Sequence, residues 1–340
     1  MSGRLAVLAC TGAVGLQDAG RRGHGRHGLS ASGPMDALAL AAANALVGNP
    51  AGTVALEFGL GGGRFRQEGG DAWMALAGAP SVIRVDGVAV ADHGTFRLPD
   101  GAGLTVEAPR RGVFAYLARA GGFAVPERLG SRALHQRAGI GGLDGRGLRA
   151  GDGLAGADDT PSLDPGFLDP LPLDTDLPVR VVLGPQADRF TPEAVALFTD
   201  AAFTVSHRAD RMGIQLDGPA LAHGPDGYNI VSDATVMGSV QVPGGGRPIV
   251  LMADRQTTGG YPKIATVISA DLRRVAQRRP GEALRFRAVP LDEAFALARE
   301  RAALVAALPR TVRARGAGLE DRLAGANLAG AAVDALSGEA

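Results

Sequence analysis

Short apolar stretches alternate with turns rich in glycine and proline along most of this chain, and few of these stretches are long enough for a helix. The apolar positions mark strand candidates at residues 4–16, 54–58, 72–76, 81–85, 95–98, 104–106, 113–117 and 179–183. Their spacing is typical of an antiparallel barrel or sandwich. The sequence therefore predicts a mainly β fold with a few helices.

Three segments show helical spacing of their apolar residues instead. The first follows Ser32 and Asp36, either of which suits the N-terminal cap of a helix, and it ends at Gly48. A short second helix begins after the capping residue Thr191. The third covers residues 291–308 and carries a broad face of alanine and leucine.

The chain length of 340 residues favours two domains, since single cores rarely grow beyond about 250 to 300 residues. Residues 156–178 are rich in proline and aspartate and show no periodicity, which is typical of a linker. We expect an N-terminal domain over residues 1–155, this linker, a C-terminal domain over residues 179–290 and a tail over residues 291–340. The tail begins with the third helix, and its end is expected to be a marginal helix or disordered.

Basic and acidic side chains balance at 35 each, so neither nucleic acid nor an anionic membrane is an expected partner. Cys10 is the single cysteine, which excludes an internal disulfide and a zinc–thiolate cluster. No apolar run is long enough to span a membrane, and the first residues do not resemble a signal peptide. We expect a soluble, cytoplasmic protein that acts on a small neutral or zwitterionic molecule.

Several common motifs of enzymes are missing from the sequence. It contains no GK[ST] phosphate loop, no GxSxG serine elbow and no HExxH zinc motif. The six histidines lack the spacing of metal ligands, so no metal site is predicted. The glycine cluster at residues 59–63 matches no dinucleotide-binding motif and is predicted to form a turn.

Residues 249–266 form the stretch with the densest candidate chemistry. An apolar run at residues 249–252 predicts a buried strand, and a polar, glycine-rich loop follows it. Lys263 is the only lysine among 35 basic residues, which indicates a position that needs a compact ammonium group, with chance as the alternative. The neighbouring hydroxyls of Thr257 and Thr258 and the accessible backbone at Gly259 favour a site over chance.

Other polar residues also lie on glycine-rich loops between predicted strands. Taken singly, each has a structural explanation, such as a helix cap at Asp36, an ion pair of Asp210 with Arg211, or a strand-end hydrogen bond at Gln241. Taken together, they favour a binding site, because loops at strand ends are where sites are usually built. The candidate set is Gln17, Asp18, Arg21, Ser32, Asp36, Asp210, Arg211, Gln241, Asp254, Gln256, Thr257, Thr258, Gly259, Gly260, Tyr261 and Lys263.

Four long blocks of this sequence resemble the allophanate hydrolase subunit 2 family, also called the biotin-dependent carboxyltransferase family, which includes the C subunit of 5-oxoprolinase. The resemblance covers roughly residues 5 to 288. The blocks are GLQDAGRRGHGRHGLSASGPMDALALAAANALVGN (15–49), YLARAGGFAVPERLGSR (116–132), SHRADRMGIQLDG (206–218) and GSVQVPGGGRPIVLMADRQTTGGYPKIATVISADL (238–272).

The resemblance implies two tandem cyclophilin-like β-barrel domains, one in each predicted domain, with the site in the cleft between them. It implies an ATP-dependent 5-oxoprolinase that converts 5-oxo-L-proline to L-glutamate together with its A and B subunits, of which the second is the subunit 1 homologue. ATP is implied as a cofactor, and it can be bound by the partner subunits. The same blocks occur in urea carboxylase carboxyltransferases and in a pair that regulates a sporulation kinase, so these two functions remain alternatives.

The opening of a lactam, which the resemblance implies, suggests roles for the candidate residues from residue type alone. Lys263, Asp254, Thr257 and Thr258 are the predicted catalytic residues. Lys263 and Arg211 or Arg21 supply cations, Asp254 or Asp18 acts as a base, and the threonine loop supplies oxyanion donors. The other candidates are predicted to bind substrate. We also expect the loop near Asp18 and the loop near Asp254 to meet across the interdomain cleft. A carboxyl transfer needs similar donors, so residue type leaves the reaction open.

Overall fold

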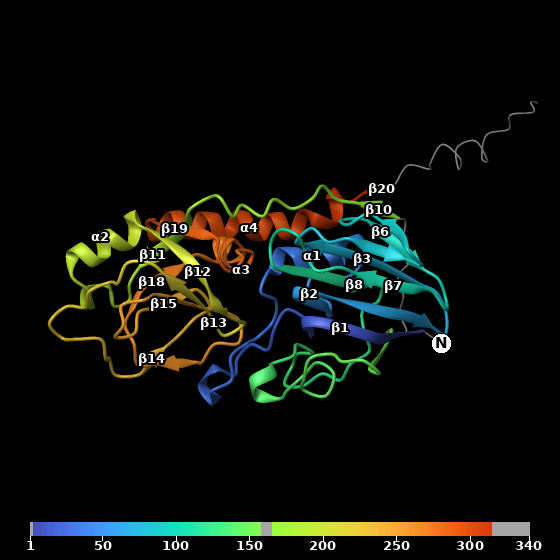
Figure 1. The fold of residues 1–340 in the computed structure, drawn as a ribbon, viewed down its shortest axis with the longest axis horizontal. Coiled ribbons are helices and arrows are strands. Elements are labelled where there is room, and N and C mark those ends of the chain that lie inside the picture. The colour runs from blue at the N-terminus through green and yellow to red at the C-terminus, as the bar shows by residue number, and fades with distance from the viewer. Residues whose placement is uncertain (1–2, 158–164, 315–340) are drawn as a thin grey trace, which may run out of the picture.

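The computed structural model describes residues 3–157 and 165–314, and these residues form a mainly β protein with four α-helices. Two β domains lie side by side, and one long helix runs along both of them (Figure 1). This arrangement confirms the predicted fold class. The helices are α1 Ala37–Leu46, α2 Pro192–Asp200, α3 Leu272–Ala276 and α4 Leu291–Thr311.

The first domain is a strongly curved, nearly closed sheet of nine strands. Its centre is β2, which pairs with β1 along most of its length and also with β7 and β8, all antiparallel. Buried side chains such as Leu16, Phe58 and Phe65 fill the interior. The strands are β1 Arg4–Gln17, β2 Ala55–Glu68, β3 Ala72–Gly78, β4 Ile83–Val85, β5 Val88–Val90, β6 Thr95–Leu98, β7 Gly103–Val106, β8 Phe114–Arg119 and β9 Gly153–Ala155.

The glycines at residues 59–63, predicted to form a turn, instead lie within β2, so that prediction is wrong. They are needed because the backbones of neighbouring strands approach closely at this point. A Cβ atom on Gly61 would lie 1.9 Å from the carbonyl oxygen of Thr11, and one on Gly62 would lie 2.2 Å from that of Val106. The run of glycines indicates a flexible backbone in the sequence, but it does not show that the backbones of neighbouring strands pass close to it.

The second domain is a closed barrel of seven strands in the order β11-β18-β15-β16-β13-β12-β19. All pairings are antiparallel except that of β11 with β19. At one end of the barrel interior, Phe198 stacks on Phe286 with ring centroids 4.4 Å apart. The strands are β11 Val179–Leu183, β12 Ala202–Ala209, β13 Gly213–Asp217, β15 Ser239–Gln241, β16 Ile249–Leu251, β18 Lys263–Val267 and β19 Ala283–Ala288.

Two short pairs of strands lie outside these sheets. β14 (Asp233–Ala234) pairs with β17 (Thr258–Gly259), and β10 (Gly166–Phe167) pairs with β20 (Arg313–Ala314). β14 and β15 lie close together in the sequence, on either side of Gly238, but they do not pair with each other. The residues of β14 instead fix the glycine loop that contains β17.

The predicted caps of the first two helices are confirmed. The Asp36 carboxylate accepts hydrogen bonds from the backbone N–H groups of Leu38 and Ala39 at the start of α1. The Thr191 side chain accepts one from Ala194 at the start of α2. Nine of the ten residues of α1 are buried, because the helix lies between the first sheet and the rest of the molecule.

The segment after the first domain is fixed at both ends by hydrogen bonds. Near its start, Gly166 exchanges hydrogen bonds with the side chain of Thr95 on β6. Near its end, the carbonyl oxygen of Leu177 accepts from Arg278, in the turn after α3, and that of Pro178 accepts from Arg274, in α3 itself. The predicted tail begins with α4, which contacts α1, and its residues 315–340 lie outside the described part of the chain.

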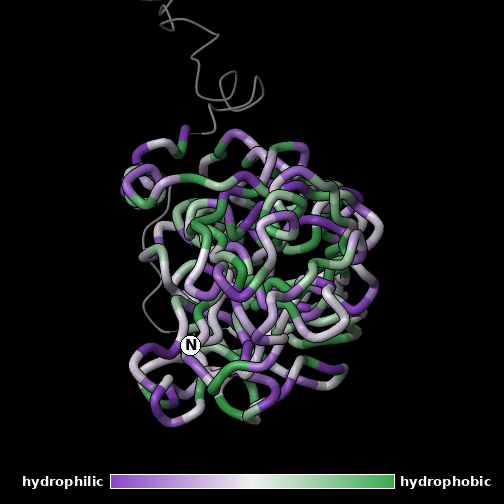
Figure 2. Tube along the Cα trace, turned by 90° about the vertical axis from the view of Figure 1, so that its left-hand side faces the viewer, coloured by the Kyte–Doolittle hydropathy of each residue, from purple (hydrophilic) through white to green (hydrophobic). Residues whose placement is uncertain are grey.

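One continuous cluster of buried apolar side chains joins α1, β8, α3, α4 and the interior of the second barrel. In Figure 2 the hydrophobic segments gather inside the molecule, while hydrophilic segments form the loops around it. The two domains are therefore packed through a shared core. Within residues 3–157 and 165–314, no helix combines the length and apolar character needed to cross a membrane.

Candidate functional site

The glycine-rich loop after β1 meets the loop after β16 at the boundary between the two domains. The hydroxyl oxygen of Ser32 lies 2.5 Å from a carboxylate oxygen of Asp254 and 2.8 Å from the carbonyl oxygen of Leu134. The first loop also contains Asp18, so the expected meeting of the two loops is observed. Ser32 has a φ of 55°, a left-handed conformation that is uncommon for a non-glycine residue and is often found at functional sites.

Arg211, in the turn between β12 and β13, is the centre of this junction. Its guanidinium donates two hydrogen bonds to the Asp254 carboxylate, at 2.9 and 3.0 Å, and one to the carbonyl oxygen of Gly33 at 2.7 Å. It also forms an ion pair with Glu57 on β2. Both carboxylates are buried. One cation of the second barrel therefore joins acidic and backbone groups of both domains.

The electrostatics of this junction keep Arg211 charged. Burial alone would lower the pKa of its guanidinium, but the Glu57 and Asp254 carboxylates outweigh burial and raise it. On the other side of Glu57, the phenol of Tyr116 donates a hydrogen bond to the carboxylate at 2.5 Å. Burial and the negative charge of Glu57 raise the pKa of Tyr116, which therefore remains a protonated donor.

Gln17, Asp18 and Arg21 connect the same loop to residues 128–134. Arg21 is fully buried and donates to the carbonyl oxygens of Arg128, Ser131 and Ala133, while Asp18 accepts from the Ser131 hydroxyl. Gln17 donates to the carbonyl oxygen of Leu134. These contacts give the three residues a role in positioning the loops around the junction.

His135 forms hydrogen bonds that fix the loop after β1. Its Nδ1 accepts a hydrogen bond from the backbone N–H of Ala138, and its Nε2 lies 2.9 Å from the hydroxyl of Ser30. Burial lowers the pKa of the imidazole, and this outweighs the raising effect of Asp254. His135 is thus a neutral ring with its proton on Nε2, which donates to Ser30.

Asp36 belongs to a second junction between the domains, which Tyr116 connects to the first by accepting from the Asp36 backbone N–H and donating to Glu57. Besides capping α1, its carboxylate accepts hydrogen bonds from Arg273 at 3.1 Å and from Gln277 at 2.9 Å, and Arg301 on α4 lies 3.9 Å away. Burial would raise the pKa of Asp36, but the charge of Arg273 leads a set of interactions that lower it. These contacts occupy the carboxylate with groups of the protein.

Lys263 lies on β18, away from the Arg211 junction. Its ammonium group is almost completely buried and donates a hydrogen bond of 2.8 Å to Asp233 on β14. Gln186 donates to the same carboxylate and also accepts from the backbone N–H of Lys263. These interactions lower the pKa of Asp233, the Lys263 hydrogen bond most strongly. Lys263 therefore fixes the β14–β17 pair against the barrel.

The glycine loop from residue 256 to residue 261 lies over the outer face of the barrel. Gln256 donates to the side-chain oxygen of Gln241 at 3.0 Å, whereas the hydroxyls of Thr257 and Thr258 have no hydrogen-bond partner in the described structure. The carbonyl oxygen of Gly260 accepts from the backbone of Ile230. A Cβ atom on Gly259 would lie 2.2 Å from the Gln241 amide nitrogen, so this glycine allows the close approach of the two segments.

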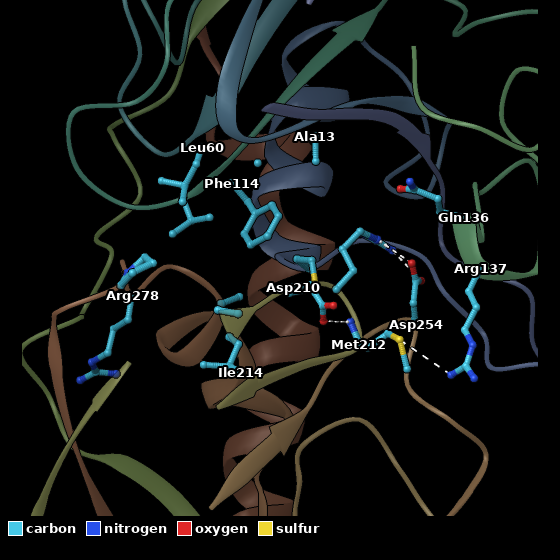
Figure 3. Close-up of a pocket in the computed structure, with 17 residues that line it drawn as sticks. Ala13, Leu60, Phe114, Gln136, Arg137, Asp210, Met212, Ile214, Asp254 and Arg278 are labelled. Carbon is cyan, nitrogen blue, oxygen red and sulfur yellow. Dashed lines mark hydrogen bonds and ion pairs between the residues drawn. The ribbon is translucent and has the colours of Figure 1, made fainter. Parts of the chain in front are cut away.

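Three cavities surround the turn at residues 209–213. The interdomain cavity, about 430 Å³, is mainly apolar, with Arg137, Asp210 and Asp254 among its polar residues (Figure 3). The β1 pocket, about 350 Å³, is lined by Gln17, Glu57, Gln136 and Arg211. The glutamine pocket, about 540 Å³, lies on the outer face of the second barrel. It is lined by His207, Arg208, Ala209, Asp210, Met212, Gly213, Gln215, Gln241, Ile249, Leu251, Gln256 and Tyr261.

The predicted site residues that line these cavities are divided between them. Arg211 and Asp254 line the interdomain cavity, while Gln241, Gln256 and Tyr261 line the glutamine pocket, and Asp210 belongs to both. Lys263 lines none of the three cavities. Seven of the sixteen candidate residues thus line these neighbouring cavities, and the other nine, including Thr257 and Thr258, line none of them.

Two residues of the site are absent from the sequence-based set. Glu57 lies in the apolar stretch ALEFGL, where a lone carboxylate in a buried strand is the only sign of its role. Gln215 lies in β13 between the buried residues Ile214 and Leu216, so strand alternation points its side chain outward without showing a pocket there. In the parts of the chain that the structure describes, no three metal-ligating side chains gather into a metal site.

Comparison with known proteins finds a matching family model and several related proteins. A family model for the carboxyltransferase domain, subdomains A and B, matches residues 27–288. The chain is 38% identical over 283 residues to the C subunit of 5-oxoprolinase from Escherichia coli, which covers 82% of this chain and 89% of that protein. It is 33% identical over 281 residues to a putative urea carboxylase of Emericella nidulans, which covers 78% of this chain and 22% of that protein.

A solved structure shows the same architecture. The crystal structure of the K. lactis urea amidolyase aligns with a TM-score of 0.83 at 25% identity, over 92% of this chain and 21% of that one. The chain therefore spans about a fifth of the length of the urea carboxylase and amidolyase relatives, and most of the length of the 5-oxoprolinase relative.

Proposed function

The chain belongs to the carboxyltransferase domain family of subdomains A and B, and from that premise we propose that it is the C subunit of an ATP-dependent 5-oxoprolinase. In this proposal it opens the ring of 5-oxo-L-proline to give L-glutamate, in a complex with the A and B subunits. The observation that carries the proposal is the 38% identity to the C subunit of a 5-oxoprolinase over 89% of that protein. A cytoplasmic location is part of the same proposal.

The chemistry of the substrate fits the groups on the segment from residue 254 to residue 263. A five-membered lactam is an unstrained amide, so its hydrolysis needs an activated carbonyl and donors that stabilise the oxyanion. The free hydroxyls of Thr257 and Thr258 are suitable donors on a glycine-rich loop. We propose that Asp254 orients the reacting water as a base, and that Lys263, at the start of β18, acts as the cation beside this loop.

ATP would be bound by the partner subunits in this proposal. In the described residues, the cations near the cavities are mostly engaged: Arg211 pairs with two carboxylates, Arg278 donates to three backbone carbonyls and Lys263 pairs with Asp233. A triphosphate needs several convergent donors. These residues do not fit a triphosphate site, so we assign no ATP contact to this chain.

A carboxyltransferase acting on urea is the second candidate. The structural likeness to the K. lactis urea amidolyase favours it, because that match covers 92% of this chain. A non-catalytic regulator of a partner is the third candidate, and it differs because it predicts that Lys263→Ala leaves the biological effect intact.

The experiment that tests the proposal is reconstitution of the complex. The chain is purified alone and together with A and B subunits of a 5-oxoprolinase, and glutamate release and 5-oxoproline-dependent phosphate release are measured. We expect little turnover by the isolated chain and full turnover by the complex. Full turnover by the isolated chain, or biotin-dependent carboxylation of urea by the complex, would contradict the proposal.

A pair of variants separates catalysis from assembly. Thr258→Val in the complex is expected to lower glutamate release while co-purification with the partners is unchanged. Thr199→Val is the matched control, because Thr199 lies on the exposed side of α2 and bonds only within its own helix. Equal rates for the two variants would remove the threonine loop from the reaction.

A further inference from the structure

The glutamine pocket has an unusual composition for an outer barrel face. Three carboxamides, those of Gln215, Gln241 and Gln256, line it together with an apolar floor formed by Ile249 and Leu251. Carboxamides are neutral groups that offer a donor and an acceptor side by side. This composition suits a neutral ligand with the complementary pair of groups.

The strand register explains the geometry of the pocket. Ile249 on β16 is paired with Gln215 on β13 and with Gln241 on β15. Side chains of paired residues lie on the same face of a sheet, and adjacent strands are about 4.8 Å apart. The two glutamines therefore flank the Ile249 side chain, with their backbones about 10 Å apart, so a flat ring resting on Ile249 has a carboxamide on each side.

The hydrogen bonds show which carboxamides are free. Gln241 accepts from Gln256, and its own amide group is 3.5 Å from the carbonyl oxygen of Tyr261. The carboxamide of Gln215 makes no hydrogen bond within the described residues and is only half-buried. Its oxygen and its NH₂ group are thus both available, while the Gln241–Gln256 pair forms a fixed wall opposite it.

One cation at the edge of the pocket is also free. Arg208, at the end of β12, forms no ion pair among the residues that the structure describes. The nearest carboxylate in the pocket, Asp210, is engaged by the backbone N–H groups of Met212 and Gly213. Arg208 is therefore in place to bind a carboxylate carried by a ligand.

We propose that the glutamine pocket binds a five-membered cyclic cis-amide, with the N–H and C=O of the ring paired with Gln215, the ring face on Ile249 and a ring carboxylate on Arg208. A cis-amide presents its N–H and C=O on one edge, which matches the two groups of a carboxamide. The lactam of 5-oxoproline and the ureido ring of biotin share this edge, but a biotinyl amide lacks the carboxylate. The inference rests on the proposed function for the chemical class of the ligand only, because it places the ring in the glutamine pocket, which Asp254 does not line.

The test is direct binding, measured with the purified full chain and read from the side-chain NH₂ signals of glutamine in NMR spectra. The probes are 5-oxo-L-proline, 2-pyrrolidone as the ring without a carboxylate, biotin amide as the ureido ring, and L-proline as a ring without an amide. We expect the first three to shift the signals of Gln215, and we expect L-proline to leave them unchanged.

Variants then assign the contacts. Gln215→Leu is expected to weaken binding of all three cyclic amides by about 10- to 100-fold, the loss typical of a two-point amide pair. Arg208→Gln is expected to weaken binding of 5-oxoproline alone. Arg247→Gln is the matched control, because Arg247 is exposed on the same barrel and pairs with Asp217 outside the pocket.

The outcomes separate this inference from the proposed function. Loss of binding in Gln136→Leu, with Gln215→Leu unchanged, would place the ring in the interdomain cavity or the β1 pocket, both of which Gln136 lines, and would overturn the inference while leaving a 5-oxoprolinase possible. Binding of biotin amide without 5-oxoproline would support the pocket and contradict the 5-oxoprolinase. Absence of binding by every cyclic amide would overturn the pocket.

Discussion

The hydroxyl of Ser32 lies 2.5 Å from the carboxylate of Asp254, although 222 residues separate them in the chain. The contact joins the glycine loop of the first domain to the loop that follows β16 in the second. Arg211 lies between them and adds hydrogen bonds to both side chains. The relative position of the two domains is therefore set at the point where the cavities meet.

We predict that Arg211→Met destabilises the protein by about 3–5 kcal/mol, because it leaves the buried carboxylates of Glu57 and Asp254 without their counter-charge. The free energy of unfolding is measured by urea denaturation. Arg247→Met is the control, since exposed pairs such as Arg247–Asp217 contribute only about 0–1 kcal/mol. Similar losses in the two variants would show that the buried ion pairs do not hold the domains.

We predict that Asp36 makes stability depend on pH in the acidic range. Its pKa is lowered in the folded protein, against about 3.9 in an unfolded chain, so its stabilising contribution is complete above the unfolded value. The contribution is lost as the pH falls through the folded value. Urea midpoints of the wild type and Asp36→Asn, measured from pH 7 to pH 3, are therefore expected to converge as the pH falls below about 4. A constant difference between them would contradict this prediction.

The sequence was sufficient for features that depend on local pattern. Asp36 and Thr191 were recognisable as helix caps because a cap is defined by its position relative to the apolar face that follows. The glycine-rich loops containing Ser32 and Asp254 were recognisable as candidates for one site, because binding sites are usually built from polar groups on loops at strand ends.

Features that depend on distant neighbours were not predictable. Asp36 is bound by Arg273 and Gln277, which lie 237 and 241 residues away, and no local pattern indicates this pairing. Glu57 shows only the pattern of an apolar strand, because its partner, Arg211, comes from the other domain.

The close strand crossing in the first domain leads to a third prediction. Gly61→Ala is expected to cost about 1–3 kcal/mol of stability or more, because its methyl group would overlap the carbonyl oxygen of Thr11 and move β1 away from β2. Thermal and urea unfolding measure the loss. Gly245→Ala is the matched control, since nothing lies within 4 Å of a Cβ atom built on Gly245. A Gly61→Ala protein as stable as the control would mean that the two strands move apart without cost.

The last prediction concerns Lys263 and separates two roles for its ammonium group. Lys263→Met removes the cation, and we expect it to lower turnover in the complex by about 10²–10³-fold if the ammonium stabilises charge on the substrate. Lys263→Arg keeps the charge but enlarges the head group at a position that is only 2% exposed, so activity is also expected to fall.

Asp233→Asn then distinguishes contact with substrate from support of the loop. If Lys263 acts only by fixing β14 and β17 through its 2.8 Å hydrogen bond to Asp233, this variant lowers turnover as much as Lys263→Met does. If the ammonium itself meets the substrate, Asp233→Asn retains most of the activity, because the cation is still present. Full activity of Lys263→Arg would contradict both roles. The single lysine would then be a matter of chance, and the catalytic loop would be centred on Asp254, Thr257 and Thr258.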